Sequence, residues 1–129
     1  MARLIHLAEE PVTDIPGVGR WQSLNDRLGI RNFGVSAVVM DPDDDSDMTH
    51  DEADCAHQEV YVVVQGRARF IAGGEELEAG PGDVVAVDDP AQTRNYKALE
   101  PGTRIVCFGA GPGAEHPYGA WIAEEAARS

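Results

Sequence analysis

The chain has 129 residues, 43% of them hydrophobic, and its 10 basic and 23 acidic side chains give a formal net charge of −13. This length and apolar content predict a single soluble globular domain over residues 1–129. The negative charge repels phosphate backbones and anionic lipids, which argues against nucleic-acid and membrane partners. No apolar run approaches about 20 residues and the N-terminus lacks the features of a signal peptide, so we expect a cytoplasmic protein.

Fourteen glycines and eight prolines separate short apolar segments, which favours an all-β fold with many turns. In chain order, residues 3–6 could form a short edge strand, and residues 10–19 have the composition of a loop. Clear strand patterns then follow at residues 35–40, 59–65, 67–72, 75–78, 83–88, 94–98 and 103–108. About seven short strands at regular spacing predict a sandwich or a closed barrel.

Glycines mark the expected turns between these strands. The pair Gly73-Gly74 predicts a hairpin, because both central positions of such a turn favour positive φ. Gly66, which closes the strand at 59–65, is predicted to have positive φ as well. After the last strand, residues 118–128 have a helix-forming composition, which predicts a short C-terminal helix.

The strand at 59–65 and the residues before it carry the most informative chemistry. Alternate side chains of a strand share a face, so His57, Glu59 and Tyr61 point together toward the expected interior. A buried imidazole beside a carboxylate is either a metal or acid/base site or an expensive burial. With His50 and Glu52 just upstream, two imidazoles and two carboxylates could hold Fe(II), Mn(II), Ni(II) or Zn(II).

The alternative interpretation has no metal at this place. A buried Glu59 carboxylate then needs another source of stabilisation, since an isolated charge in an apolar interior is costly. Candidate partners in the sequence are Arg94, Arg104 and Tyr61.

The two cysteines belong to no paired motif, so we expect both to be reduced. Cys107 lies within an apolar run and is expected to pack in the core. Cys55 lies in a polar loop between His50 and His57, where it could be a metal ligand, a reactive thiol or an incidental loop residue.

Several segments resemble the motifs of the cupin family of small conserved β-barrels. The first cupin motif is similar to His-x-His, a short gap, Glu, six residues and Gly, and the second to Gly-Asp, four residues, a turn and His. The matching segments here are His50-Asp51-Glu52, Glu59 to Gly66, Gly82-Asp83 and Pro90-Ala91-Gln92-Thr93. The resemblance implies a double-stranded β-helix, or jelly-roll barrel, over about residues 33–110, with an N-terminal extension at 1–32 and a C-terminal tail at 111–129. It also implies a homodimer that shares edge strands.

The sequence departs from the cupin pattern at the ligand positions. His50 and Glu59 keep the usual residue types, but Glu52 stands in place of a histidine. The last histidine of the pattern is replaced by Thr93, with Arg94 beside it.

These departures leave two functions open. One is a small-molecule-binding barrel with a degenerate or optional divalent metal site. The other is a metal-dependent dioxygenase, isomerase or cyclase that acts on a small organic molecule, in which the ion activates O₂ or polarises a carbonyl. In either case Tyr61 and Arg94 are the expected pocket residues, and Arg94 could clamp a substrate carboxylate bidentately or, alternatively, pair with a surface acid. The sequence does not decide whether the protein is an enzyme.

Overall fold

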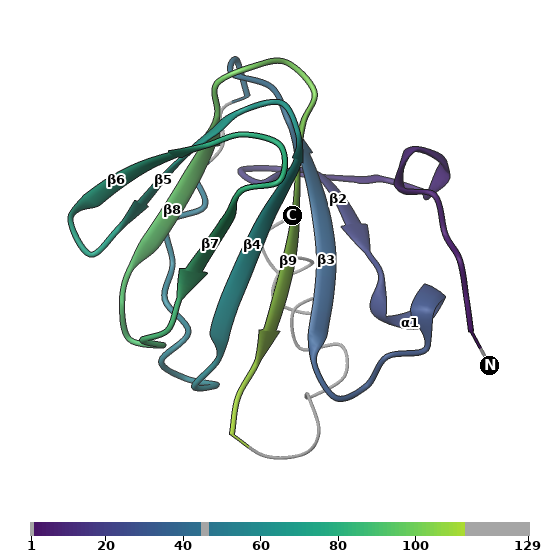
Figure 1. The fold of residues 1–129 in the computed structure, drawn as a ribbon, viewed down its shortest axis with the longest axis horizontal. Helices are drawn as coiled ribbons and strands as arrows, with labels where there is room; N and C mark the ends of the chain where they lie inside the picture. The colour runs from purple at the N-terminus through teal and green to yellow at the C-terminus, as the bar shows by residue number, and fades with distance from the viewer. Residues whose placement is uncertain (1, 45–46, 113–129) are drawn as a thin grey trace.

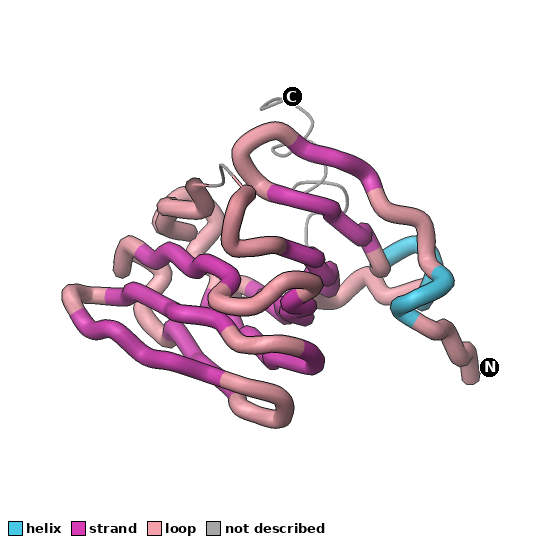
Figure 2. Tube along the Cα trace, turned by 90° about the horizontal axis from the view of Figure 1, so that it is seen from above, coloured by secondary structure: helices cyan, strands magenta, loops and turns pink. Residues whose placement is uncertain are grey.

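The computed structural model describes residues 2–44 and 47–112, which form two antiparallel sheets. The larger sheet contains six strands, in the spatial order β1 (Thr13–Ile15), β2 (Gly19–Ser23), β3 (Gly34–Met40), β9 (Thr103–Ala110), β4 (Gln58–Gln65) and β7 (Val84–Val87). The smaller sheet has the order β6 (Glu75–Ala79), β5 (Ala68–Ala72) and β8 (Arg94–Ala98). It lies beside the β7 end of the larger sheet (Figure 1, Figure 2), and the two sheets together make the predicted jelly-roll β-barrel.

Strand β4 runs along the middle of the barrel wall and alternates between the interior and the outside. Its buried residues are Glu59, Tyr61 and Val63, which is the period of two expected for a half-buried strand. Its neighbour β9 is aligned so that Tyr61 lies opposite Cys107. The register between the two strands shifts after Val63, immediately before the chain turns at Gly66.

Aromatic rings from both sheets meet at the centre of the interior. The ring centroid of Tyr61 (β4) lies 5.5 Å from that of Phe70 (β5) and 5.2 Å from that of Tyr96 (β8). Phe70 and Tyr96 are 5.6 Å apart. The two contacts of Tyr61 join the larger sheet to the smaller one, and at these distances each tilted pair adds about 1 kcal/mol beyond the burial of its surface.

The N-terminal part of the chain covers the outer face of β3 and β9. The second apolar cluster contains Val35 and Ala37 of β3, Val106 of β9 and Leu24. The half-buried side chains that pack against this cluster are Ile5, Leu7, Leu28, Ile30 and Phe33. They come from segments that include a 3-10 turn, η1 (Leu7–Glu9), and a single helical turn, α1 (Asn25–Leu28). The extension therefore buries the outer face of one half of the larger sheet.

Two expectations for this N-terminal region were wrong. Residues 3–6 form no strand, and the expected loop at 10–19 contains β1 and the first residue of β2. Strand β2 pairs with β3, where Trp21 lies opposite Val38. These pairings form because the edge of β3 is available once the barrel is folded, which is a tertiary condition that local composition does not report.

The seven strands predicted between residues 35 and 108 are all present, with ends that differ by at most two residues from the expected ones. The turn glycines also behave as predicted, with φ values of 77° at Gly66, 56° at Gly73 and 82° at Gly74. Among the described residues, no helix is long and apolar enough to cross a membrane. The helix expected at 118–128 lies outside the described residues.

Candidate functional site

The candidate site lies at the end of the barrel where β4 begins. His57 immediately precedes β4, and its side chain faces inward with those of Glu59 and Tyr61, as the period of two predicts. The exposed fractions of these three residues are 1%, 4% and 1%. An imidazole, a carboxylate and a phenol are therefore buried in a row along one strand.

Strand β8 brings a second set of groups to the same place. The backbones of Arg94 and His50 are bridged by two hydrogen bonds, from His50 N to Arg94 O at 2.9 Å and from Arg94 N to His50 O at 2.8 Å. Both residues thus lie at one level of the barrel. This pairing connects the loop before β4 to the end of the second cupin motif, where Thr93, in place of the last histidine, is exposed and the next residue, Arg94, faces the interior.

The Glu59 carboxylate lies at the centre of a network of donors. Arg94 Nη1 donates to Glu59 Oε1 at 2.8 Å, and the Tyr61 hydroxyl donates to the same oxygen at 2.7 Å. The Cys107 thiol donates to Oε2 at 3.3 Å. Burial disfavours the charged carboxylate, but the hydrogen bonds from His50 and Tyr61 and the charges of His50 and Arg94 outweigh burial and lower the pKa of Glu59. The metal-free interpretation named Arg94, Arg104 and Tyr61 as candidate partners, and of these Arg94 and Tyr61 contact Glu59.

Arg94 is fully engaged by the protein itself. Its Nε and Nη2 donate to the Gln92 carbonyl at 3.1 and 2.8 Å, and Nη2 also donates to the carbonyls of Asp89 at 3.0 Å and Pro90 at 3.3 Å. With 2% of its surface exposed, it is no surface ion pair, so that expectation was wrong. A bidentate clamp on a substrate carboxylate needs guanidinium donors that face a ligand, and here they face Glu59 and the backbone. The guanidinium donors of Arg94 therefore bind groups of the protein itself.

His50 lies between two carboxylates. Its Nε2 is 3.4 Å from Glu52 Oε1 and 3.5 Å from Glu59 Oε1, and its Nδ1 contacts the Met48 carbonyl. Burial disfavours the charged imidazole, but the hydrogen bonds to Glu52, Glu59 and Met48 raise the pKa of His50 to about 10. His50 therefore acts as a second cation beside the two carboxylates at neutral pH.

His57 belongs to a different group of side chains. Its ring nitrogen, the Cys55 sulfur and a Glu52 carboxylate oxygen lie within 4.8 Å of one another, whereas His50 and Glu59 form the other group with Glu52. The four residues predicted as one metal site are thus divided into two groups that share Glu52. The distance between successive inward positions of β4 separates His57 from Glu59, because alternate residues of a strand are almost 7 Å apart, about twice the rise per residue.

Two cysteines approach these groups. Cys55 donates to Glu52 Oε2 at 3.0 Å, which is consistent with the ligand alternative kept open for it. Cys107 is buried as predicted, but its contact with Glu59 was not foreseen. Burial, together with the Glu59 charge, raises the pKa of the Cys107 thiol well above its usual value. The register of β4 against β9 brings Cys107 to this place, and register is not readable from one strand alone.

The residues at the cupin ligand positions fit a metal ion poorly. The set there is His50, Glu52, Glu59 and Arg94, which takes the inward-facing position because Thr93, the residue aligned with the last histidine, is exposed. A guanidinium has five donors and no lone pair to offer, so it cannot be a ligand. Its charge lies against the Glu59 oxygen that an ion would need. In this set the cations His50 and Arg94 lie beside the carboxylates of Glu52 and Glu59 and balance their negative charge.

The comparisons with known proteins identify the fold. No protein-family model and no curated protein matches the sequence. The structure is similar to KdgF from Halomonas sp., with a TM-score of 0.68 at 18% identity over 88% of this chain and 96% of that chain. A cupin protein from Bacteroides fragilis gives a TM-score of 0.63 at 18% identity, with 91% and 90% of the chains covered. A cupin 2 conserved barrel domain protein from Salinispora arenicola gives 0.58 at 17% identity, with 100% and 98% covered.

These similarities show that the chain has the cupin fold, which confirms the fold expected from the motif resemblance. At such low sequence identity the similarities establish the fold but not the function, because one barrel supports many chemistries. The function must be argued from the side chains of the site.

Proposed function

We propose that the protein is a cupin barrel that binds a small molecule and in which the Arg94 guanidinium, and not a metal ion, neutralises the Glu59 carboxylate. The observation that carries this proposal is the buried ion pair of Arg94 Nη1 and Glu59 Oε1 at 2.8 Å, with side-chain exposures of 2% and 4%. A carboxylate in such surroundings needs a cation close by. Arg94 supplies that cation from the inward-facing position next to Thr93, the residue that replaces the histidine. The metal site of the cupin pattern is degenerate in this interpretation.

The end of the barrel beside Glu52 is the proposed binding place. A shallow hollow opens there, lined by Ala56, Gln58, Pro90, Ala110, Gly111 and Pro112. The Glu52 carboxylate and the overall charge of −13 disfavour anionic ligands and favour neutral molecules that donate hydrogen bonds, such as polyols. Tyr61 and Arg94 support this binding place indirectly, because their hydrogen bonds fix the position of the Glu59 carboxylate.

A gain of metal binding tests the first part of the proposal. Arg94→His places a histidine at this inward-facing position and removes the competing charge, so this variant should take up Mn(II), Fe(II) or Ni(II) at a site that a further His50→Ala substitution abolishes. The unmodified protein should hold no metal that depends on His50 or Glu59. Plasma mass spectrometry after reconstitution and desalting measures both. A stoichiometric ion in the unmodified protein that is lost in Glu59→Gln would refute the proposal.

A thermal-shift panel tests the second part. Chelator-treated protein is screened against neutral polyols, carboxylates and phosphates, with Glu52→Gln as the matched variant that keeps the side-chain volume. We expect the neutral hydroxylated compounds to raise Tm and the anions to have little effect. Stabilisation of the unmodified protein by anions alone, or only after addition of a divalent ion, would contradict the proposed ligand class.

A metal-dependent dioxygenase, isomerase or cyclase is the second candidate. It is favoured by one observation, namely that His50 Nε2 lies 3.4 and 3.5 Å from oxygens of Glu52 and Glu59. Ligand atoms that surround one ion in a tetrahedron, with bonds of about 2.1 Å, are separated by about 3.4 Å. The same reconstitution experiment decides between the candidates, because only this one requires an ion bound through His50 in the unmodified protein.

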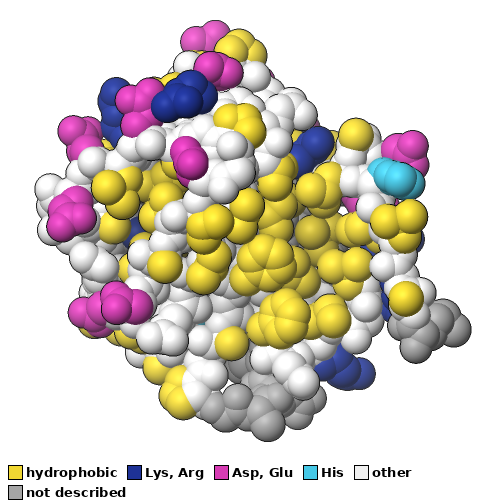
Figure 3. Space-filling view, in the orientation of Figure 1, with side chains coloured by type: hydrophobic (Ala, Val, Ile, Leu, Met, Phe, Trp, Pro, Cys, Tyr) yellow, Lys and Arg dark blue, Asp and Glu magenta, His cyan; other side chains and the backbone are white. Residues whose placement is uncertain are grey.

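We further propose that the protein is a cytoplasmic homodimer. In support, hydrophobic side chains form a broad patch over β4, β9 and β3 (Figure 3). The N-terminal extension covers the β3 half of this outer face, but Val60, Val64, Val84 and Phe108 remain 37%, 43%, 61% and 37% exposed. A contiguous exposed apolar face of this kind is typical of an interface.

A further inference from the structure

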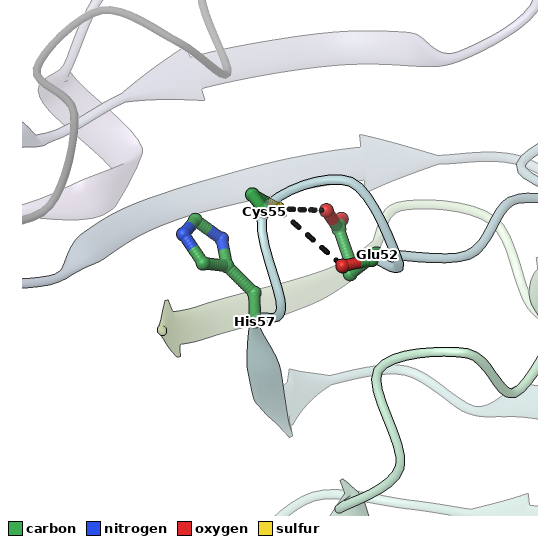
Figure 4. A group of neighbouring side chains, drawn as sticks. All are labelled: Glu52, Cys55 and His57. Carbon is green, nitrogen blue, oxygen red and sulfur yellow. Dashed lines mark hydrogen bonds between the residues drawn. The ribbon is translucent and has the colours of Figure 1, made fainter. Parts of the chain in front are cut away.

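The loop before β4 holds a set of donors that differs from the cupin pattern. Cys55 Sγ, a carboxylate oxygen of Glu52 and a ring nitrogen of His57 lie within 4.8 Å of one another. Figure 4 shows the three side chains on one short loop, with Glu52 and Cys55 turned toward each other and the His57 ring beside them. Glu52 and His57 are buried and Cys55 is half-buried. A thiol, an imidazole and a carboxylate are thus held together away from bulk water.

The backbone of this loop is held in a strained conformation. Among the described residues, Ala56 is the only residue other than glycine with positive φ, at 56°. It lies between Cys55 and His57. A non-glycine residue in this region costs roughly 1 kcal/mol or more, and such strain persists when the surrounding structure requires it, often at ligand sites.

Gly111 fixes the loop from the other side. A Cβ atom at Gly111 would lie 2.7 Å from the Cys55 carbonyl oxygen and 3.2 Å from His57 Cδ2. Only glycine allows the two segments to approach so closely. The Glu52 backbone is also anchored, because its N–H donates to the Pro90 carbonyl at 2.8 Å. The donor atoms are therefore positioned by the fold.

We propose that Glu52, Cys55 and His57 form a zinc-type metal site that is separate from the position of the cupin metal. Thiolate, imidazole and carboxylate are the ligands that Zn(II) takes, and three protein ligands leave one position open for water or a ligand molecule. In the metal-free protein the Cys55 thiol donates to Glu52 Oε2 at 3.0 Å. When the ion binds, sulfur and oxygen become its ligands, and the thiol proton is released to solvent.

This site is compatible with the ion-pair network around Glu59. Glu52 has two carboxylate oxygens, and they face different neighbours: Oε1 lies 3.4 Å from His50 Nε2, and Oε2 accepts from Cys55. An ion bound through Oε2 leaves the contact of Oε1 with His50 in place. The inference goes beyond the proposed function and does not require it, because the Arg94–Glu59 pair and the zinc-type site use different atoms.

Cobalt(II) is the probe that tests the inference, because a thiolate ligand gives it a near-ultraviolet charge-transfer band. We expect chelator-treated, reduced protein to bind about one equivalent of Co(II) with this band, and Zn(II) to displace it. Cys55→Ser should abolish the band, and Glu52→Gln should weaken Co(II) binding by about tenfold or more. Cys107→Ser is the matched control and should keep the band.

Three outcomes would overturn the inference: uptake below about a tenth of an equivalent, binding without a thiolate band, or a band that survives Cys55→Ser. Because Cys55 is only half-buried, Cys55→Ser should fold, and this variant is therefore the decisive test. Circular dichroism verifies that Cys55→Ser is folded. Glu59→Gln separates the two proposals. Co(II) that depends on Glu59 and His50 but not on Cys55 would refute both. A band that depends on Cys55 but not on Glu59 supports the zinc-type site, whatever the outcome of the ligand screen.

Discussion

Removal of the Arg94 guanidinium should destabilise the protein strongly. In Arg94→Met the long apolar side chain fills much of the same space, but the Glu59 carboxylate, 4% exposed, loses its charged partner at 2.8 Å. The carbonyls of Asp89, Pro90 and Gln92 also lose their donors. The variant therefore tests whether the buried pair is as tightly coupled as its geometry indicates.

The expected magnitude follows from these contacts. Breaking a buried ion pair by removal of one partner costs about 3–5 kcal/mol, and a lost hydrogen bond to a carbonyl costs about 1 kcal/mol where water does not replace it. Protonation of Glu59 and the remaining bond from Tyr61 reduce this sum. We expect a loss of about 3–5 kcal/mol in the free energy of unfolding, which corresponds to a decrease in Tm of roughly 10–20 °C.

A double-mutant cycle in urea, followed by intrinsic tryptophan fluorescence, measures the coupling. The single variants are Arg94→Met and Glu59→Gln, and the double variant combines them. Because the double variant leaves no buried charge unpaired, its cost should be about 1–3 kcal/mol below the sum of the single costs. A loss below about 1 kcal/mol in Arg94→Met, or strictly additive costs with unchanged m-values, would show that the pair is weakly coupled and would refute the reasoning.

Four further outcomes are expected. Gly66→Val should lower the free energy of unfolding by roughly 3 kcal/mol or more. The reason is that φ at this position is 77° and that the new Cβ would meet Thr103 Oγ1 and lie 2.8 Å from Thr103 Cα. A urea midpoint near that of the parent would contradict this prediction. His50, whose pKa rises from 6.5 to about 10 on folding, stabilises fully below about pH 6.5, and this contribution is lost as the pH rises through 10. In chelator-treated protein, unfolding free energies at pH 7 and 10 should therefore differ less in His50→Gln than in the parent, and an equal difference would exclude His50 as the cause. Val84→Glu on the exposed face of β7 should convert a dimer to a monomer in light scattering while circular dichroism shows an intact fold, and a persistent dimer would place the interface elsewhere. Ala56→Gly should relieve the positive φ and leave Tm unchanged or slightly higher by calorimetry, whereas a clear decrease would show that the loop is not strained.

The strands and turns could be predicted because their signals are local. The alternation of buried and exposed residues in β4, and the positive φ at Gly66, Gly73 and Gly74, follow from backbone geometry that neighbouring residues determine. The N-terminal strands could not be predicted in this way. β2 forms against the edge of β3 and β1 against β2, and the glycines and prolines around these short strands are typical of a loop.

The candidate site was predicted as a set of residues but not as an arrangement. The alternation of side chains along a strand predicted that His57, Glu59 and Tyr61 share a face, and all three are buried in the structure. The separation of His57 from the group around Glu59, and its proximity to Cys55, depend on a strained residue in the loop and on the close approach of Gly111.

The sequence by itself thus determined the class of fold, the barrel strands and the pool of titratable side chains, since periodicity and glycine positions act over a few residues. Only the tertiary structure decided which of these side chains meet. Arg94 and Glu59 are 35 positions apart, and Cys107 and Glu59 are 48 apart, yet each pair is in contact because strand pairing and register bring them to one level of the barrel. Electrostatic interactions of buried groups depend on distances of a few ångströms, so the balance of charge in this site became visible only in the folded chain.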